Sequence, residues 1–102
     1  MSSGKFDAYI MDVEGKLFVR PAVTWVNGGG LFRIKNLTEH DAVIEPDGEV
    51  HRKKLSVGAG QDAQIKVNAT ASGQYSYAVW LNLGSYAVRV SAESDPVMIV
   101  EP

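Results

Sequence analysis

The chain has 102 residues, with ten lysines and arginines against twelve acidic residues, and it contains no cysteine. This length and an ordinary composition of 45% hydrophobic and 22% charged residues predict one globular domain over residues 1–102. The absence of cysteine excludes disulfides, thiolate metal sites and cysteine nucleophiles. A net charge of −2 supplies no long-range field that would attract nucleic acid or an anionic membrane.

Almost every segment alternates apolar and polar residues with the period of two that is typical of strands. In chain order, the alternating segments cover residues 6–13, 17–20, 22–26, 31–36, 41–45, 49–55, 61–67, 73–82, 86–90 and 97–101. Clusters of turn residues separate them, and no stretch keeps apolar residues at helical spacing for the ~10–12 residues that a helix needs. The pattern predicts an all-β protein, a single antiparallel Greek-key sandwich of about 7–8 strands.

In a sandwich, each strand turns alternate side chains toward the core. The alternation predicts Lys35, Lys66 and Arg89 in water. The residues expected inside are Trp25, Phe32, Ile34, Val43, Ile65, Val67, Tyr75, Tyr77, Val79, Val97 and Ile99.

The glycine run Asn27–Gly30 invites comparison with a phosphate-binding loop. Phosphate loops lead into a helix, whereas LFRIK after this run alternates as a strand. We therefore expect a hairpin turn in which glycine supplies a positive φ.

Three stretches, taken together, resemble the cupredoxins, the small β-sandwiches that hold blue copper. LFRIKNLTEHDAVI (31–44) is similar to the family's strand and loop that open with asparagine and carry its first histidine ligand, which His40 matches. LSVGAGQDAQIKVNATASGQYSYAV (55–79) resembles the run toward the copper cysteine, and SDPVMIVEP (94–102) resembles the closing strand. The resemblance covers about the C-terminal two-thirds of the chain and implies a cupredoxin-like fold.

The chain departs from the family at the other ligand positions. A blue-copper site needs two imidazoles, a thiolate and usually an axial thioether. Ala78-Val79 stands where the family has cysteine, Asn82 falls where its second histidine is expected, and Met98 belongs to the last strand. The fold is expected without type 1 copper and without electron transfer.

The chain has two histidines, His40 and His51. Together with a carboxylate such as Glu39, Asp41 or Glu49 they could hold copper or zinc, which makes a metal-handling protein the alternative function. The other interpretation is a loop histidine and a strand histidine that never meet. No spacing suggests a catalytic constellation, so we expect no enzyme and no cofactor.

The leading hypothesis is a non-catalytic binding or protein-interaction module. Its expected contact surface is formed by the loop Leu37–Asp41 and the segment Trp80–Tyr86, with His40, Trp80, Asn82 and Tyr86 as contact residues. The resemblance implies that the two loops lie side by side, because in the family they ligate one ion, and loops on a rigid sandwich collect binding sites. The alternative is that Leu37 and Leu83 fill this end with packed apolar side chains. We expect an unknown protein or small-molecule partner, and neither nucleic acid nor membrane. The start MSSGKFDAY shows no secretory signal, which predicts the cytoplasm by default and leaves the periplasm open.

Addition of Cu(II) tests the loss of the type 1 site. We expect no intense visible charge-transfer band, because the chain has no thiolate to supply the strong copper–sulfur bond. Absorption spectra recorded during the titration check this, and a blue product would contradict it.

Overall fold

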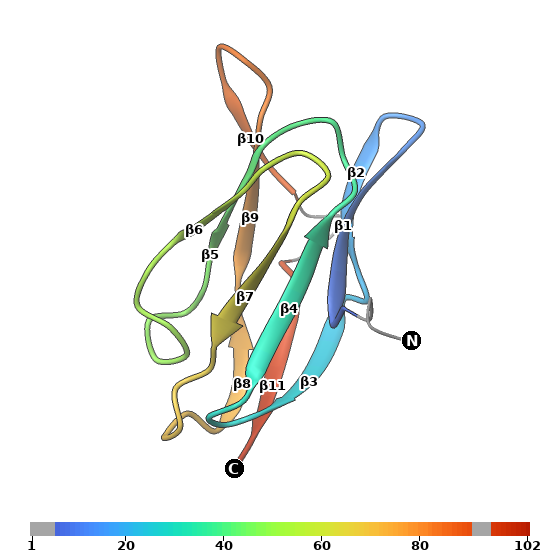
Figure 1. Ribbon diagram of the computed structural model, residues 1–102. Coiled ribbons are helices and arrows are strands. Elements are labelled where there is room, and N and C mark those ends of the chain that lie inside the picture. The colour runs from blue at the N-terminus through green and yellow to red at the C-terminus, as the bar shows by residue number, and fades with distance from the viewer. Residues whose placement is uncertain (1–5, 91–94) are drawn as a thin grey trace.

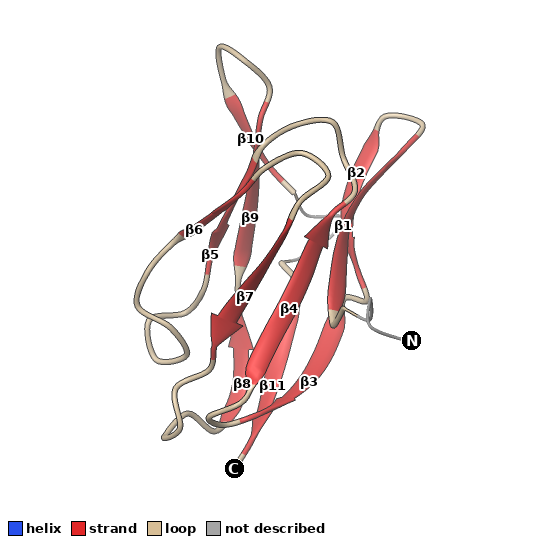
Figure 2. Ribbon diagram, viewed as in Figure 1, coloured by secondary structure: helices blue, strands red, loops and turns tan. Residues whose placement is uncertain are grey.

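The computed structural model describes residues 6–90 and 95–102, which form eleven strands and no helix (Figure 2). None of these residues therefore belongs to a helix long and apolar enough to cross a membrane. The strands are β1 (Ala8–Val13), β2 (Lys16–Arg20), β3 (Val23–Asn27), β4 (Leu31–Asn36), β5 (Ala42–Glu45), β6 (Leu55–Val57), β7 (Asp62–Lys66), β8 (Gly73–Ser76), β9 (Ala78–Asn82), β10 (Ala87–Arg89) and β11 (Val97–Glu101).

The strands form two layers packed face to face (Figure 1). The first layer is the sheet β2-β1-β4-β7. The second layer contains the sheet β3-β11-β8 and the sheet β10-β9-β5-β6. Strands β8 and β9 follow one another with only Tyr77 between them, so one nearly continuous segment belongs to both sheets of the second layer.

The predicted all-β sandwich is confirmed, and two details differ from the sequence prediction. The strands number eleven and not 7–8, and the predicted segment 73–82 alone forms two of them, β8 and β9, on either side of Tyr77. The pairing is mixed, because β1 lies parallel to β4 and β3 lies parallel to β11, while the other strand pairs are antiparallel.

The core between the layers is built from the alternation that the sequence predicts for β4, β7 and β9. Phe32 and Ile34 of β4, Ile65 of β7 and Val79 of β9 are fully buried. Tyr77 joins the two layers, since its ring meets that of Phe32 edge to face with the centroids 5.3 Å apart. Such an edge-to-face pair adds stabilisation beyond the area it buries.

The glycine run after β3 is a turn, as predicted, but it links the two layers and is not a hairpin. Gly29 has a φ of 80°, which a residue with a Cβ rarely adopts. A Cβ on Gly28 would lie 3.2 Å from the carbonyl oxygens of Ala69 and Ala71. The run is therefore explained by the crossing of the chain between sheets.

The predicted orientation of β3 and β11 is wrong. Trp25 is 62% exposed, and Val97 and Ile99 are half-buried on the outer side of their sheet. The inward residues of these strands are instead Thr24, Val26, Met98 and Val100. Val43 of β5 is likewise half-buried and faces outward, because its neighbours Ala42 and Ile44 supply the core.

Two alanine substitutions distinguish the inward from the outward aromatic side chains. Phe32→Ala should lower the free energy of unfolding by about 3–5 kcal/mol, because it leaves a cavity between the layers. Trp25→Ala should change it by no more than about 0.5 kcal/mol, as expected for a surface position. Urea denaturation of both variants checks this, and a core-sized loss for Trp25→Ala would contradict the orientation of β3.

Candidate functional site

The candidate site begins at Asn36, the last residue of β4. Its side chain is fully buried, although an amide is costly to bury unless its hydrogen-bonding groups are satisfied. The backbone N–H of Asn36 donates to the carbonyl of Gln61 at 2.8 Å, and that of Leu37 donates to Ile10 at 2.9 Å. These bonds fix the point at which the chain leaves the sheet.

The side-chain amide of Asn36 connects two loops. Its N–H groups are shared among three carbonyl oxygens, those of His40 at 2.7 Å, Val57 at 3.1 Å and Gly58 at 3.3 Å. Its Oδ1 accepts the backbone N–H of Thr38 at 3.0 Å and the Thr38 hydroxyl at 2.7 Å. The Asn36 side chain therefore determines the conformation of the loop Leu37–Asp41 and ties it to the end of β6.

Thr38 completes this network from inside the loop. Its side chain is buried, and its hydroxyl accepts the backbone N–H of His40 at 3.2 Å. Both backbone groups of His40 are consequently engaged, while its imidazole makes no hydrogen bond or ion pair with a described residue. The half-buried His40 ring is thus carried by a backbone with little freedom.

The second predicted segment lies directly beside this loop. The backbone N–H of Asn82, at the end of β9, donates to the carbonyl of Asp41 at 2.9 Å. The Asn82 side chain accepts the N–H of Gly84 at 3.0 Å, and Leu83 donates to Tyr86 at 2.9 Å, so the β9–β10 turn is internally bonded. His40 and Asn82 therefore belong to adjacent segments, as the sequence analysis expected for the two loops.

A shallow groove of about 290 Å³ runs along the outer surface at this junction. Asp41, Ser56 and Asn82 supply its polar side chains, and Gly58 also lines it. Asp41 Oδ1 also accepts the N–H of Ala59 at 3.1 Å, which holds that carboxylate at the groove. Its other lining residues are Ala42, Val43 and Val57. The sequence analysis does not predict Ser56 and Gly58 at this site, because they come close to Asp41 through the β5–β6 pairing and the bond from Ala59 to Asp41, which link positions distant in the chain.

Trp80 and Tyr86, the two aromatic residues predicted at the contact surface, differ in their exposure to solvent. Trp80 lies between Val43 and Arg89 in the sheet register and is half-buried. Its indole N–H donates to Glu45 Oε1 at 3.4 Å, and the Arg89 guanidinium lies 5.6 Å from the ring centroid. Tyr86 is 62% exposed on the β9–β10 turn. Trp80 is thus neither a core residue nor a fully exposed one.

The positions that match copper ligands do not form a ligand set. Ala78 and Val79 are buried hydrophobic residues, and the chain has no thiolate to offer in their place. Met98 pairs with Tyr75, seven residues before Asn82, which at ~3.3 Å per residue places it roughly 20 Å along the segment. The residues present therefore do not fit a type 1 copper ion.

His51 lies far from His40. Its Nδ1 is 3.1 Å from the carbonyl oxygen of Lys66, which pairs with Leu31 at the beginning of β4. His40 follows the other end of β4. The two imidazoles are therefore separated by about the length of that strand, roughly 15–20 Å. No cluster of three or more histidines, cysteines or acidic residues with metal-binding geometry occurs within residues 6–90 and 95–102.

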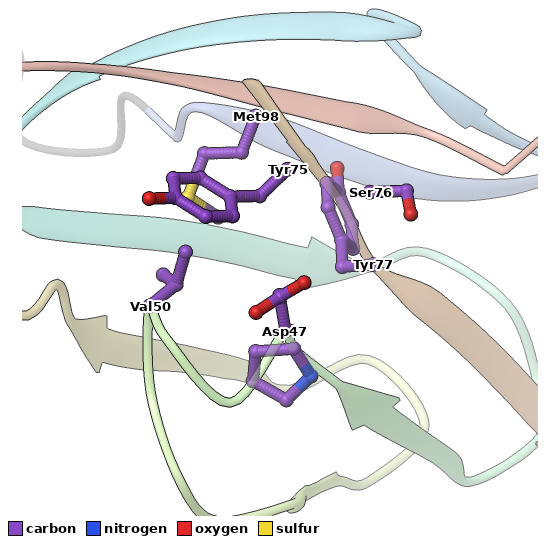
Figure 3. A pocket seen from close by; sticks show the side chains of 7 residues that line it. Asp47, Val50, Tyr75, Ser76, Tyr77 and Met98 are labelled. Carbon is purple, nitrogen blue, oxygen red and sulfur yellow. The ribbon is translucent and has the colours of Figure 1, made fainter. Parts of the chain in front are cut away.

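Two other hollows among the described residues are less suited to a ligand. One is lined by Tyr75, Tyr77 and Met98 of the second layer together with Pro46, Asp47, Val50 and Ser76, and it leaves no room for a water molecule (Figure 3). Another, of about 430 Å³, is lined by Val13, Glu14, Lys16, Phe18 and Arg20, all from the β1–β2 hairpin. With one hairpin as its only wall, that hollow has no second element to fix a ligand.

Tyr77 is the buried titratable group in this part of the chain. Burial raises the pKa of its hydroxyl far above the ordinary value, with a smaller increase from Asp7, while the Thr24 hydroxyl opposes the shift. The two hydroxyls do not meet hydrogen-bond geometry, and neither has a partner among the described residues. Tyr77 thus stays a neutral phenol and acts as a packing residue.

Comparison with known proteins agrees with this geometry. No family model matches the chain, and no curated protein matches it. Among solved structures, a purple cupredoxin from Nitrosopumilus maritimus is similar with a TM-score of 0.58 and 14% identity, over 95% of this chain and 100% of that one. A mutant amicyanin in its reduced Cu(I) form is similar with a TM-score of 0.57 and 13% identity, over 99% of this chain and 86% of that one.

These similarities establish the class of fold. The chain has a cupredoxin-like β-sandwich fold in which most of the type 1 copper ligands are missing. At such low identity the similarity concerns the fold and leaves the function to be argued from the residues.

The network around Asn36 can be tested by removing its side chain. Asn36→Ala should lower the free energy of unfolding by about 2–4 kcal/mol, because buried carbonyl groups lose their donor. Thr38→Val should cost less, about 1–2 kcal/mol, since one hydroxyl is lost and the volume is kept. Urea denaturation measures both, and an Asn36→Ala variant as stable as the wild type would contradict the network.

Proposed function

We propose that this protein is a non-catalytic binding module that contacts a polypeptide partner. The contact surface consists of the loop Leu37–Asp41, the groove along Asp41, Ser56 and Asn82, and the adjoining Trp80. The single observation that carries the proposal is the buried Asn36 side chain, which bonds loop 37–41 to the end of β6 and thereby holds the two sides of the groove together.

A preorganised surface favours binding, because the partner then does not have to order the loop. The backbone of His40 is held at both its N–H and its C=O, and the turn after β9 is closed by its own hydrogen bonds. The side chains of Ser56 and Tyr86 make no hydrogen bond with a described residue, so they can vary without disturbing this framework. A backbone fixed by the scaffold together with exposed loop side chains is typical of recognition loops on β-sandwiches.

The shape of the groove supports a polypeptide rather than a small metabolite as the partner. Small-molecule sites enclose most of the ligand surface, whereas this groove is shallow and open along the outer face of β5 and β6. Trp80 and Tyr86 add aromatic surface beside it, and aromatic residues are enriched where proteins contact one another.

The non-catalytic part of the proposal rests on the surroundings of His40. A general base must lie within hydrogen-bond reach of the group it serves and is usually oriented by a second residue. The His40 imidazole has no such partner among the described residues. The alternative of copper or zinc handling by His40 with His51 receives no support from their positions, because the residues flank opposite ends of β4.

A peptide-library selection tests the proposal, with the wild-type protein as bait and the bound peptides mapped by amide chemical shifts. We expect selected peptides to shift amides of the loop Leu37–Asp41 and of Asn82. Ser56→Lys should weaken their binding at least ~10-fold, because it fills the groove with a long charged side chain.

Gln64→Lys is the matched control, since Gln64 is an exposed strand residue on the other layer. It should leave the affinity unchanged. Peptides that bind equally well to Ser56→Lys, or that shift amides elsewhere, would refute the assignment of this surface.

A further inference from the structure

A second surface, separate from the groove, lies on the outer side of the sheet β3-β11-β8. Val23 and Trp25 of β3 are 45% and 62% exposed, and they pair in register with Val97 and Ile99 of β11, which also face outward. Gln74 and Ser76 of β8 complete the face. Apart from Glu101 at one end, its side chains are uncharged, and the four apolar ones are adjacent.

Strand β3 also has one edge that no other described strand pairs with. Val97 N–H donates to the carbonyl of Ala22 at 2.8 Å, and Gly28 N–H donates to that of Glu101 at 2.7 Å. Because bonds in a parallel pair come from alternate residues, Thr24 and Val26 bond to β11, and the backbone groups of Val23 and Trp25 point away from it. No described strand pairs with that side of β3.

Edge strands usually carry devices that prevent pairing, such as lysine or another charge. The end strands β2, β7 and β10 carry charged residues, and Lys53 and Lys54 precede β6. The remaining uncharged end strand, β8, lies against the segment 46–50. Strand β3, with the sequence VTWVN, has neither a charge nor a covering segment among the described residues.

We propose that β3 is the interface of a reversible homodimer, in which the β3 strands of two copies pair antiparallel about a two-fold axis at Trp25. Each Trp25 N–H then donates to the Trp25 carbonyl of the second copy. Val23 pairs with Asn27, whose carbonyl oxygen also accepts the Gly30 N–H at 2.9 Å and has a second lone pair for the Val23 N–H. The result is one continuous sheet, β8-β11-β3 followed by the same strands of the second copy in reverse order.

Charge and register are compatible with a second copy. An isologous interface brings like residues together, which would be unfavourable for a charged edge, but β3 is neutral. In the antiparallel register, the two Glu101 carboxylates, each beside Asn27, lie at opposite ends of the joint sheet. The two tryptophans lie opposite each other on its outer face, where aromatic cross-strand pairs are favourable.

The exposed area indicates a weak dimer. A tryptophan side chain covers roughly 150–250 Å², so an exposed fraction of 62% leaves on the order of 100–150 Å² of Trp25 in water. Edge pairing brings only side chains of β3 against the second copy, so Trp25 and Val23 supply the apolar contact, whereas Val97 and Ile99 of β11 stay on the outer face of the joint sheet. Stable dimers bury about 800 Å² per partner, so the edge hydrogen bonds must supply much of the stabilisation. We expect a dissociation constant on the order of 0.1 mM.

Sedimentation velocity of the wild-type protein from about 10 μM to 1 mM is the test. The sedimentation coefficient should rise from the monomer value toward the dimer value over this range. Val23→Pro removes one outward N–H and leaves the bonds to β11 intact, and proline is tolerated at the first residue of a strand. Trp25→Lys places a charge at the two-fold axis. Both variants should raise the dissociation constant at least ~10-fold.

Tyr86→Lys is the matched control, because Tyr86 is 62% exposed like Trp25 but lies on the β9–β10 turn. It should dimerise like the wild type. A wild type that stays monomeric at 1 mM overturns the proposal, as does a Trp25→Lys variant that still dimerises. A monomer that binds an unrelated extended peptide at β3 would assign this edge to a foreign strand and would equally overturn it.

Discussion

The buried amide of Asn36 is the interaction on which the organisation of one end of the sandwich depends. A single side chain at the end of β4 donates to carbonyl groups of two loops and accepts two donors from Thr38. Since an unsatisfied buried amide would be costly, the loops are held to the positions that satisfy it. The adjacent segments are held in turn by backbone hydrogen bonds. The carbonyl oxygen of Asp41 accepts the N–H of Asn82, which fixes the β9–β10 turn relative to β5.

This end of the molecule shows how a cupredoxin-like fold can keep its loops in place without a metal ion. The side chains that would have to converge on copper have been replaced or lie elsewhere: Val79 is part of the core, Asn82 caps a turn, and Met98 packs roughly 20 Å along the same segment. The buried, hydrogen-bonded side-chain amide of Asn36 links the loops from the interior of the sandwich. The side chains on the outer surface at this end are therefore not held by a type 1 copper ion, which is compatible with the contact surface proposed above.

The sequence predicted the β-sandwich and the strands whose inner and outer residues differ in polarity. In LFRIKN and DAQIK the alternation is unambiguous, and Phe32, Ile34 and Ile65 are buried as expected. In VTWV and VMIV nearly every residue is apolar, so a period of two does not distinguish the faces, and Trp25, Val97 and Ile99 were assigned to the wrong side. The local sequence pattern also does not predict the hydrogen bonds of Asn36, because Val57 and Gly58 follow about twenty residues later in the chain. The separation of His40 from His51 depends on strand order, which the alternation does not encode.

The place of β11 in its sheet has a consequence for how the chain reaches this fold. Residues 97–101 are the last strand in sequence, yet they form the central strand, parallel to β3 and antiparallel to β8 (Figure 1). On a ribosome, β3 and β8 would therefore wait without a neighbour until this final strand emerged from the exit tunnel. Pairing between residues more than seventy positions apart must close a long loop, which slows folding. Completion of the second layer therefore follows the synthesis of both β3 and β8, and a chain truncated before residue 97 would expose both of these strands to other strands.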